Sequence, residues 1–308
     1  MPDSSRQLPM LQHPAPTAPE APATPAPFDR IAVVGLGLVG GSIALAARAT
    51  WPQALVIGVD RNAVLEQAMV RHAIDVASDD LMIISEANLV LLATPVAEIV
   101  RLMPRLPDCV RTDAVVTDVG STKRAVMAAA RGLPARLPFI GGHPLAGAAR
   151  GGFEAARPDL CVGRLWLLVP GADGSADALG KLTPFIEGLG AVPIVVASAA
   201  EHDRMLALLS HLPQLAASAL MAVVGEGVGA EGLALAGRGL VDTTRLASSP
   251  ADIWRDICAT TADEIGPALD RLIVTLQQLR DRLTAGEEID RLFESAREWR
   301  ERLVADRA

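Results

Sequence analysis

Four glycines within one short stretch constrain the fold of this chain more than any other feature. Gly35, Gly37, Gly40 and Gly41 separate a β-branched apolar run from a run rich in alanine and leucine. In this G-x-G-x-x-G spacing the first glycine makes a tight turn, the second lets a pyrophosphate approach the backbone and the third lets a helix pack closely. The stretch therefore predicts the first strand, turn and helix of a dinucleotide-binding sheet. The predicted cofactor contacts are Gly35, Gly37, Leu38, Val39 and Gly40.

The next apolar run ends in an acidic residue at the spacing that this motif requires. Asp60 follows Leu55–Val59, about 20 residues after Gly40. A carboxylate there accepts hydrogen bonds from both ribose hydroxyls and repels a 2′-phosphate, so it predicts NAD rather than NADP. Arg61 has two interpretations: a cation that weakens this discrimination, or a solvated side chain.

From Asp29 onward, short β-branched runs alternate with helical stretches, which predicts βαβ units. Most runs are continuously apolar, as expected for strands that are covered on both faces. We therefore predict an α/β fold with a Rossmann-type doubly wound, mostly parallel sheet. Thr94 and Pro95 follow one of these strands and are predicted to line the cofactor crevice. The predicted strands are Ile31–Val34, Leu55–Val59, Leu89–Ala93, Ala114–Asp118, Phe139–Gly141, Leu165–Val169 and Val192–Val196.

The sequence after Ala197 has no further strand pattern and shows a 3.6-residue apolar period. It predicts an all-helical dimerisation domain, because helices with this much apolar surface often bury part of it against a second copy. The predicted boundaries are a disordered Pro/Ala-rich tail at 1–28, a dinucleotide-binding domain at 29–197 and a helical substrate and dimerisation domain at 198–308. The predicted apolar faces are Leu269, Leu272, Ile273, Leu276, Leu279 and Leu283 and, after a break at Ala285-Gly286, Ile289, Leu292, Phe293, Ala296 and Trp299.

Charge and cysteine content exclude several classes of protein. The 308 residues carry a net charge of −8 and therefore lack the basic surface that nucleic-acid binding needs. The three cysteines are odd in number and include no C-x-x-C pair. We therefore expect reduced cytoplasmic thiols and neither a disulfide framework nor a metal site.

Two apolar runs must be weighed as membrane spans. Ile31–Ala47 is shorter than the roughly 20 residues that a span needs, and Met205–Gly225 contains polar groups such as His211 and Gln214. We expect a buried core helix at Met205–Gly225. Met1–Pro27 has no apolar h-region, so we expect no signal peptide, no membrane association and a cytoplasmic location.

The chain has only five histidines, so candidates for acid–base chemistry are few. His13 lies in the predicted tail, His72 in a polar helix, and His202 at a helix start, where we expect a structural role. His143 follows a predicted strand in the segment 141–144, Gly-Gly-His-Pro. The glycines allow a ligand to approach closely at the sheet edge of the cofactor crevice, so His143 is the predicted base.

A hydroxyl group follows the end of a neighbouring strand. Ser121 lies in the segment 118–123, Asp-Val-Gly-Ser-Thr-Lys, at the predicted start of a helix. It has two interpretations: an ordinary helix N-cap, or a group that orients a substrate.

Five motifs occur in one order along the chain. They are G-x-G-x-x-G-G-S at 35–42, D-x-G-S-x-K at 118–123, G-G-H-P-x-A-G at 141–147, S-H-L-P at 210–213, and D-T-T-R at 242–245 with W-R-D at 254–256. With them the sequence resembles the prephenate/arogenate dehydrogenase family of tyrosine biosynthesis, from about Asp29 to Leu283. The resemblance implies the same architecture, a dinucleotide-binding domain followed by a helical domain that makes the dimer.

The resemblance also implies a reaction: oxidation of a cyclohexadienol at C4, with loss of the ring carboxylate as carbon dioxide. His143 matches the histidine that accepts the proton of the C4 hydroxyl, and Ser121 matches the serine that holds this hydroxyl. Arg245 matches the arginine that binds the ring carboxylate through a bidentate ion pair. The implied function is NAD-dependent conversion of prephenate to 4-hydroxyphenylpyruvate.

Two positions depart from the family pattern. Gln214 replaces a histidine that contacts the substrate side chain, and its neutral amide offers no negative charge to the ammonium of arogenate. We therefore favour prephenate and leave arogenate, or both substrates, open. The stretch Ala146–Arg150 lacks the acid that members commonly carry, which puts an ionic gate with Asp242 in doubt.

Ser210 and Trp254 match positions that line the substrate pocket, with helix packing as the other interpretation.

Two other classes of protein share a dinucleotide-binding sheet. Dehydrogenases of the β-hydroxyacid or 6-phosphogluconate type place a lysine and an asparagine beyond the sheet, but no lysine follows Lys181 and no asparagine follows Asn88. A dinucleotide-sensing Rossmann protein without chemistry is the remaining alternative. The joint presence of Ser121, His143 and Arg245 argues against it.

Overall fold

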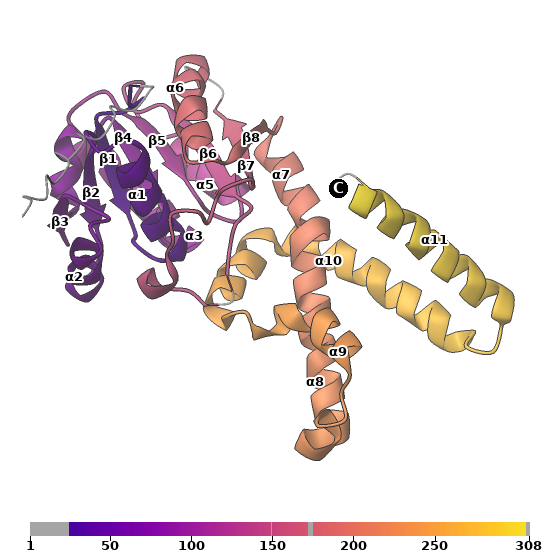
Figure 1. Cartoon of the computed structure of the whole chain (residues 1–308). Helices are drawn as coiled ribbons and strands as arrows, with labels where there is room; N and C mark the ends of the chain where they lie inside the picture. The colour runs from indigo at the N-terminus through magenta and orange to yellow at the C-terminus, as the bar shows by residue number, and fades with distance from the viewer. Residues whose placement is uncertain (1–24, 149, 172–174, 306–308) are drawn as a thin grey trace, which may run out of the picture.

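The computed structural model describes residues 25–148, 150–171 and 175–305. The first part of the chain forms one eight-stranded sheet between two layers of helices, and the second part is helical (Figure 1). The strand order is β3-β2-β1-β4-β5-β6-β7-β8. The strands are β1 Arg30–Val34, β2 Leu55–Val59, β3 Val76–Ser78, β4 Leu89–Leu92, β5 Val115–Asp118, β6 Phe139–Pro144, β7 Leu165–Pro170 and β8 Val192–Val195.

All neighbouring strands are parallel except β6 and β7. The chain winds outward from β1 to β3 on one side and from β4 on the other, so the order reverses between β1 and β4. Ligands of doubly wound sheets bind at this point, beyond the carboxyl ends of the strands. The predicted fold class, a mostly parallel Rossmann-type sheet followed by a helical domain, is confirmed.

Apolar cores cover both faces of the sheet. On one face α1 and α6 pack side chains such as Ile43 and Phe185 against Ile31, and on the other α3 and α5 pack Ile99 and Val126. Double coverage explains why the strands are continuously apolar. The helices of this part are α1 Leu38–Thr50, α2 Asn62–Val70, η1 Leu81–Glu86, α3 Val96–Leu102, η2 Met103–Arg105, α4 Leu106–Cys109, α5 Arg124–Ala130, η3 Phe153–Ala155 and α6 Ser175–Gly188.

All seven predicted strands are present, with small differences at their ends. The sequence pattern does not predict β3, because three partly exposed residues at the sheet edge carry too short an apolar run. β6 continues to Pro144, because its antiparallel pairing with β7 includes His143 and Pro144. His143 therefore lies within the strand rather than after it.

The fold begins earlier than the predicted tail boundary at residue 28. Phe28 is only 4% exposed and packs edge-on against Phe185, with ring centroids 5.8 Å apart. An aromatic side chain buries a large apolar surface, so this residue belongs to the core and not to a tail. Residues 1–24, the rest of the predicted tail, lie outside the described residues.

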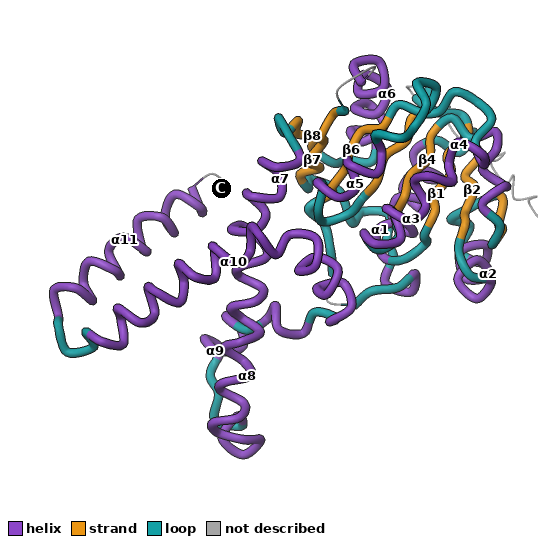
Figure 2. The backbone as a smooth tube through the Cα atoms, turned by 180° about the vertical axis from the view of Figure 1, so that it is seen from behind, coloured by secondary structure: helices purple, strands orange, loops and turns teal. Residues whose placement is uncertain are grey.

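The second part of the chain consists of helices from Ala199 to Ala305. α8 and α9 project from the sheet domain in one direction, and the end of α10 forms a hairpin with α11 that projects in another (Figures 1 and 2). The hairpin turn between α10 and α11 coincides with the predicted break. The elements are α7 Ala199–Leu206, the π-helix η4 Ala207–His211, α8 Leu212–Leu233, α9 Arg238–Thr243, η5 Arg245–Ser248, α10 Ala251–Asp281 and α11 Gly286–Ala305.

The expectation of a buried core helix at Met205–Gly225 is wrong for the single chain. The segment is helical, but only 22% of the most apolar window in Ala199–Leu233 is buried, and Leu209 is 74% exposed. By length and composition alone, this helical stretch is also apolar enough to cross a membrane. In α7, η4 and α8 several polar side chains are buried, including His211 and Gln214. Many of the large apolar side chains of these helices face outward instead.

Candidate active site

The predicted glycine positions differ in what surrounds them. Gly35 has φ +94°, and a Cβ there would lie 2.8 Å from the Ala93 carbonyl. A Cβ on Gly40 would overlap the Gly35 carbonyl oxygen, whereas a Cβ on Gly37 would meet nothing within 4 Å. The first and third glycines therefore serve the turn and the helix packing, and Gly37 faces open space through which a ligand can approach.

The start of α1 is suited to an anion. Gly37 is its N-cap without a side-chain hydrogen bond, and the first turn, which includes Leu38 and Val39, contains no acid. The free N–H groups and the helix dipole therefore remain available to a pyrophosphate. Next to the turn, the Thr94 hydroxyl is buried and has no hydrogen-bond partner in the described chain, and Pro95 is the N-cap of α3. These residues fit a dinucleotide.

Asp60 is tied to the glycine turn at the end of β2. Its carboxylate accepts hydrogen bonds from the backbone N–H of Leu36 and of Arg61, each at 2.7 Å. The Arg61 side chain is 89% exposed, and its Nε lies 3.9 Å from the carboxylate. The turn thus holds a negative charge at the position where a ribose is expected, while Arg61 extends into solvent.

Two imidazoles and a carboxylate form a chain from the sheet to the helical part. His143 Nδ1 lies 2.9 Å from His202 Nε2, and His202 Nδ1 lies 2.8 Å from Asp203 Oδ1. His143 belongs to β6, and the other two belong to α7. His202 and Asp203 are fully buried, and His143 is 9% exposed.

The carboxylate determines the tautomers of both rings. Since ionised Asp203 can only accept, His202 carries its proton on Nδ1 and has a lone pair on Nε2. His143 must then donate from Nδ1, which leaves the lone pair of its own Nε2 unused. The network therefore prepares His143 to accept a proton.

Burial and hydrogen bonding support these protonation states. Burial alone would raise the pKa of Asp203, but hydrogen bonds from His202 and from the backbone N–H groups of Arg124 and Lys123 outweigh it and lower the pKa. Burial, and next the neighbouring His202, Lys123 and His211, lower the pKa of His143 well below 6.5. Asp203 is therefore a carboxylate and His143 a neutral base at pH 7.

A buried ion pair fixes the backbone beside His143 and Ser121. Asp118, at the end of β5, pairs with Lys123 and accepts hydrogen bonds from the N–H of Gly120 at 2.8 Å and of Gly142 at 2.9 Å. Burial lowers the pKa of Lys123, although Asp118 opposes this shift. The pair thereby connects the ends of β5 and β6, where the predicted catalytic hydroxyl and base lie.

Ser121 does not cap a helix. α5 begins at Arg124 with Lys123 as its N-cap and has no side-chain cap. The Ser121 side chain is half-buried and makes no hydrogen bond within the described residues. Of its two interpretations the N-cap is therefore wrong, and a role toward substrate stays a prediction.

The predicted substrate-binding residues of the helical part fall into two groups. Ser210 and Trp254 lie beside His211, whose ring is edge-on to the Trp254 indole with centroids 5.8 Å apart. Burial lowers the pKa of His211 to about 4, and neither ring nitrogen has a partner in the described chain. The second group is Arg245, which belongs to η5, and Gln214, which bonds to the next residue of η5, Leu246.

Arg245 is the first residue of η5, and its exposed side chain makes no ion pair with any described residue. Gln214 does not present a free amide, because its Nε2 donates to the Leu246 carbonyl at 2.6 Å and its Oε1 accepts from Ser249 at 3.1 Å. The expected contact of Gln214 with the substrate side chain stays a prediction that this geometry does not favour.

The residues that the sequence analysis missed are His202 and Asp203. Ser198 caps α7 by accepting a hydrogen bond from the Glu201 N–H, which agrees with the expected helix start. Nothing local indicates that the adjacent histidine faces His143, 59 positions away. The pair of His202 and Asp203 is recognised only in the folded chain, where both side chains are buried and His202 lies against His143.

Known protein families match both parts of the chain. The model of the prephenate dehydrogenase nucleotide-binding domain matches residues 43–195, and that of the prephenate dehydrogenase dimerization domain matches residues 198–298. The chain belongs to the prephenate dehydrogenase family. The family resemblance seen in the sequence motifs is thereby confirmed, and the protein is an oxidoreductase.

Relatives with different names support the same family. The prephenate dehydrogenase of Bacillus subtilis is 34% identical over 89% of this chain and 76% of its own length. The cyclohexadienyl dehydrogenase of Zymomonas mobilis is 32% identical over 88% and 94% of the two chains. Both relatives are similar over nearly the whole of this enzyme.

Solved structures extend the likeness to the whole fold. The Aquifex aeolicus prephenate dehydrogenase in complex with hydroxyphenyl propionate and NAD⁺ has a TM-score of 0.81, with 27% identity over 89% of this chain and 98% of the other. The Synechocystis arogenate dehydrogenase has a TM-score of 0.75, with 29% identity over 89% and 99%. The relatives carry the names of both substrates, so substrate choice rests on this chain's own residues.

Proposed function

We propose that this enzyme oxidises prephenate with NAD and releases carbon dioxide and 4-hydroxyphenylpyruvate. The observation that carries the proposal is the hydrogen-bonded chain from His143 through His202 to Asp203, at the same edge of the sheet as the glycine turn. It gives a neutral, oriented base where a dinucleotide and a substrate can meet. A dinucleotide sensor would have no use for such a base.

In this proposal His143 Nε2 takes the proton of the C4 hydroxyl while hydride leaves C4. Bound NAD supplies the hydride acceptor. Ser121 holds the same hydroxyl, and Arg245 binds the ring carboxylate, which keeps C4 at the base. The carboxylate then leaves as carbon dioxide, its electron pair makes the ring aromatic, and His143 returns the proton to the oxygen at C4. Protons therefore balance over the whole reaction.

Charge supports prephenate and NAD over their alternatives. The pyruvyl side chain of prephenate carries no ammonium, and neither Gln214 nor the stretch Ala146–Arg150 offers an acid that would pair with one. The carboxylate of Asp60 opposes the 2′-phosphate of NADP. We infer that arogenate and NADP are poorer substrates.

A four-way rate comparison tests the proposal. Prephenate and arogenate are each assayed with NAD and NADP by the absorbance of the reduced nicotinamide. The expected result is the highest kcat/KM with prephenate and NAD. A preference for arogenate contradicts the substrate assignment, and no activity in any of the four reactions contradicts the function.

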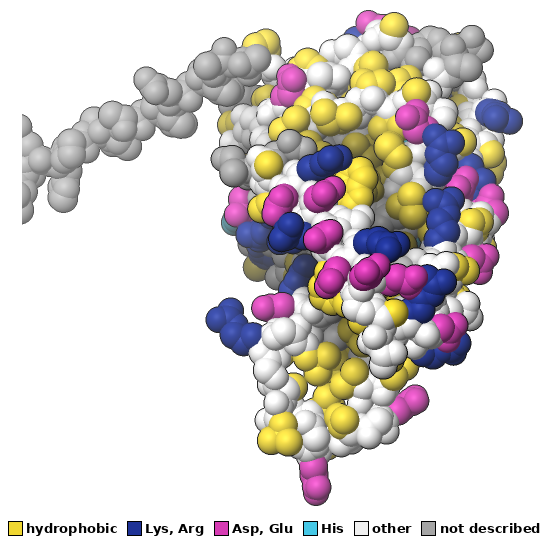
Figure 3. All heavy atoms as spheres, turned by 90° about the vertical axis from the view of Figure 1, so that its right-hand side faces the viewer, with side chains coloured by type: hydrophobic (Ala, Val, Ile, Leu, Met, Phe, Trp, Pro, Cys, Tyr) yellow, Lys and Arg dark blue, Asp and Glu magenta, His cyan; other side chains and the backbone are white. Residues whose placement is uncertain are grey.

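We also infer that the enzyme is a homodimer that covers the exposed apolar surface of its helical part. Large apolar side chains are exposed there: Val223 of α8 by 68%, Leu235 between α8 and α9 by 89%, and Phe293 of α11 by 67%. In Figure 3 hydrophobic side chains lie open on the protruding end formed by α8 and α9. Apolar surface of this extent is typical of an interface between chains.

The cysteines are free thiols, which supports a cytoplasmic location.

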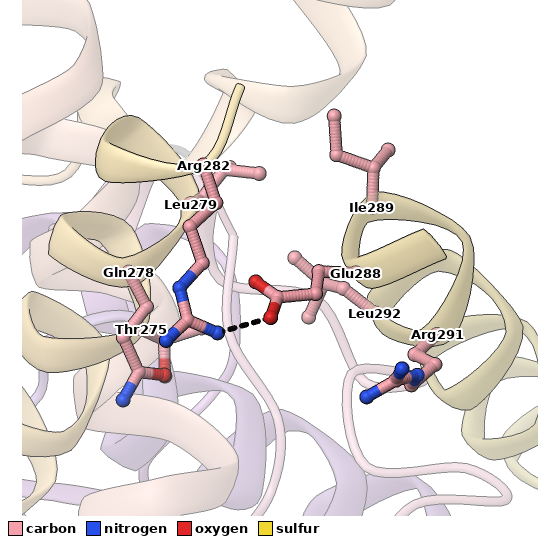
Figure 4. Close-up of a pocket in the computed structure, with 8 residues that line it drawn as sticks. All are labelled: Thr275, Gln278, Leu279, Arg282, Glu288, Ile289, Arg291 and Leu292. Atoms are coloured by element: carbon pink, nitrogen blue, oxygen red, sulfur yellow. Dashed lines mark ion pairs between the residues drawn. The ribbon is translucent and has the colours of Figure 1, made fainter. Parts of the chain in front are cut away.

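The α10–α11 hairpin offers a groove to a second chain. Leu279, Ile289 and Leu292 line it, and an ion pair between Arg282 and Glu288 joins the two helices (Figure 4). The groove lies on the hairpin rather than at His143. We assign it to the dimer contact and not to substrate.

Light scattering at micromolar concentration tests the dimer. The enzyme is expected to have twice the mass of one chain. Phe293→Glu is expected to reduce the measured mass toward that of a single chain. Met69→Glu, at a 42% exposed position of α2, is the matched control. A monomeric wild-type enzyme, or one that sediments with lipid vesicles, contradicts the inference.

A further inference from the structure

The amide of Gln214 is fully used inside the protein. Gln214 lies in the first turn of α8 and is 5% exposed. Its Nε2 donates to the Leu246 carbonyl at 2.6 Å and to the Ser218 hydroxyl at 3.3 Å, and its Oε1 accepts from the Ser249 hydroxyl at 3.1 Å. One side chain of α8 thus bonds to the second residue of η5, Leu246, and to its C-cap, Ser249.

The segment that Gln214 holds has little structure of its own. η5 is a single four-residue turn of 3₁₀ helix, and such turns are stable only when neighbours fix them. Arg245 opens this turn, and its exposed side chain has no ion-pair partner among the described residues. The position of the guanidinium therefore depends on how the backbone of η5 is held.

We propose that Gln214 is a positioning residue that directs Arg245 toward the ring carboxylate of the substrate through η5. This inference rests on the proposed function of Arg245. It changes the role of Gln214 from contact with the substrate side chain to support of the carboxylate site. Prephenate and arogenate share the ring carboxylate and differ in the side chain, so the two roles predict different substrate dependences.

The amide is chemically suited to this task because it donates to a carbonyl and accepts from a hydroxyl at the same time. Leucine has nearly the same size but makes neither bond. Glutamate keeps the acceptor and places a charge against the Leu246 carbonyl. Ser249→Ala removes only the bond to Oε1, so it weakens the support with the least change to the fold.

Steady-state kinetics at saturating NAD test the proposal. Gln214→Leu is expected to raise KM about tenfold, the size of one or two lost hydrogen bonds, and by the same factor for prephenate and for arogenate. kcat is expected to change less than twofold and the KM for NAD not at all. Ser249→Ala is expected to raise both substrate KM values by a smaller factor. Gln67→Leu, at an exposed position of α2, is the control.

A double-mutant cycle identifies the route of the effect. In an Arg245→Gln background, Gln214→Leu is expected to add nothing, because the guanidinium that it positions is gone. A full additional loss in that background overturns the proposal. So does a KM increase confined to one of the two substrates, or wild-type KM values in both Gln214→Leu and Ser249→Ala. A wild-type enzyme without activity on either substrate is instead a failure of the proposed function.

Discussion

The sheet part and the helical part of this enzyme differ in how their functional groups are held. In the sheet part, glycines and strand ends place backbone N–H groups and Asp60 through contacts within one βα unit or between adjacent strands. In the helical part, His202, Asp203 and Gln214 act through partners on distant segments. The cofactor site is thus built locally and the substrate site by packing.

The two parts also differ in burial. The sheet is covered on both faces, whereas α8 to α11 leave many large apolar side chains exposed. The chemistry lies between these parts, where β6 meets α7. A change in the sheet part should therefore affect the cofactor or the fold, and a change at the junction should affect catalysis.

The largest effect is expected at the junction itself. His143→Asn removes the base, so kcat should fall by about 10² or more. NAD binding should be unchanged, because the glycine turn and Asp60 are untouched. Stopped-flow rates and NAD titration by protein fluorescence check this pair of outcomes. An unchanged turnover would remove His143 from the mechanism.

Acid should destabilise the helical part through His211. Its pKa is about 4 in the folded chain and near 6.5 when unfolded, so the unfolded chain binds a proton first as the pH falls. The contribution of neutral His211 to the free energy of unfolding should be fully present above pH 6.5 and decline toward pH 4. The total decline from this residue should be on the order of 3 kcal/mol. Denaturant unfolding at pH 7 and pH 4.5 measures the decline.

A matched pair of variants assigns that decline. His211→Gln should make the unfolding free energy less dependent on pH, while His72→Gln, at an exposed position of the sheet part, should leave the dependence as it is. Equal pH dependence in His211→Gln and the wild-type enzyme would show that His211 is not the group responsible.

Sequence reasoning works best where a requirement is local. Gly35 must have positive φ and Gly40 must lack a Cβ, so both are found from spacing alone. The role of Asp60 is predicted from its spacing after Gly40 along the chain. The continuous apolar strands reveal the sheet for the same reason, whereas β3 is too short to give a pattern.

Sequence reasoning fails where a role depends on packing. His202 reads as an ordinary residue of a capped helix start, because its partner lies on β6. Gln214 reads as a substrate contact by likeness to the family, because the position of η5 against α8 cannot be seen in one sequence. The exposed face of α8 reads as core, since composition does not tell a core from an interface.

Two alanine substitutions in the glycine turn should separate folding from cofactor binding. Gly40→Ala should lower the free energy of unfolding by about 1–3 kcal/mol, because its Cβ overlaps the Gly35 carbonyl. Gly37→Ala should leave the melting temperature unchanged and raise the KM for NAD, because its Cβ enters open space on the path of the pyrophosphate. Equal melting temperatures for both variants would contradict this division of roles.

The smallest effect, about a tenfold loss of kcat, is expected from His202→Leu, because the base itself remains and only its orientation and tautomer are released. His202→Gln, which can still accept a hydrogen bond from His143, should recover part of the rate. A wild-type kcat in His202→Leu would mean that the two parts share a contact at this point but no chemistry.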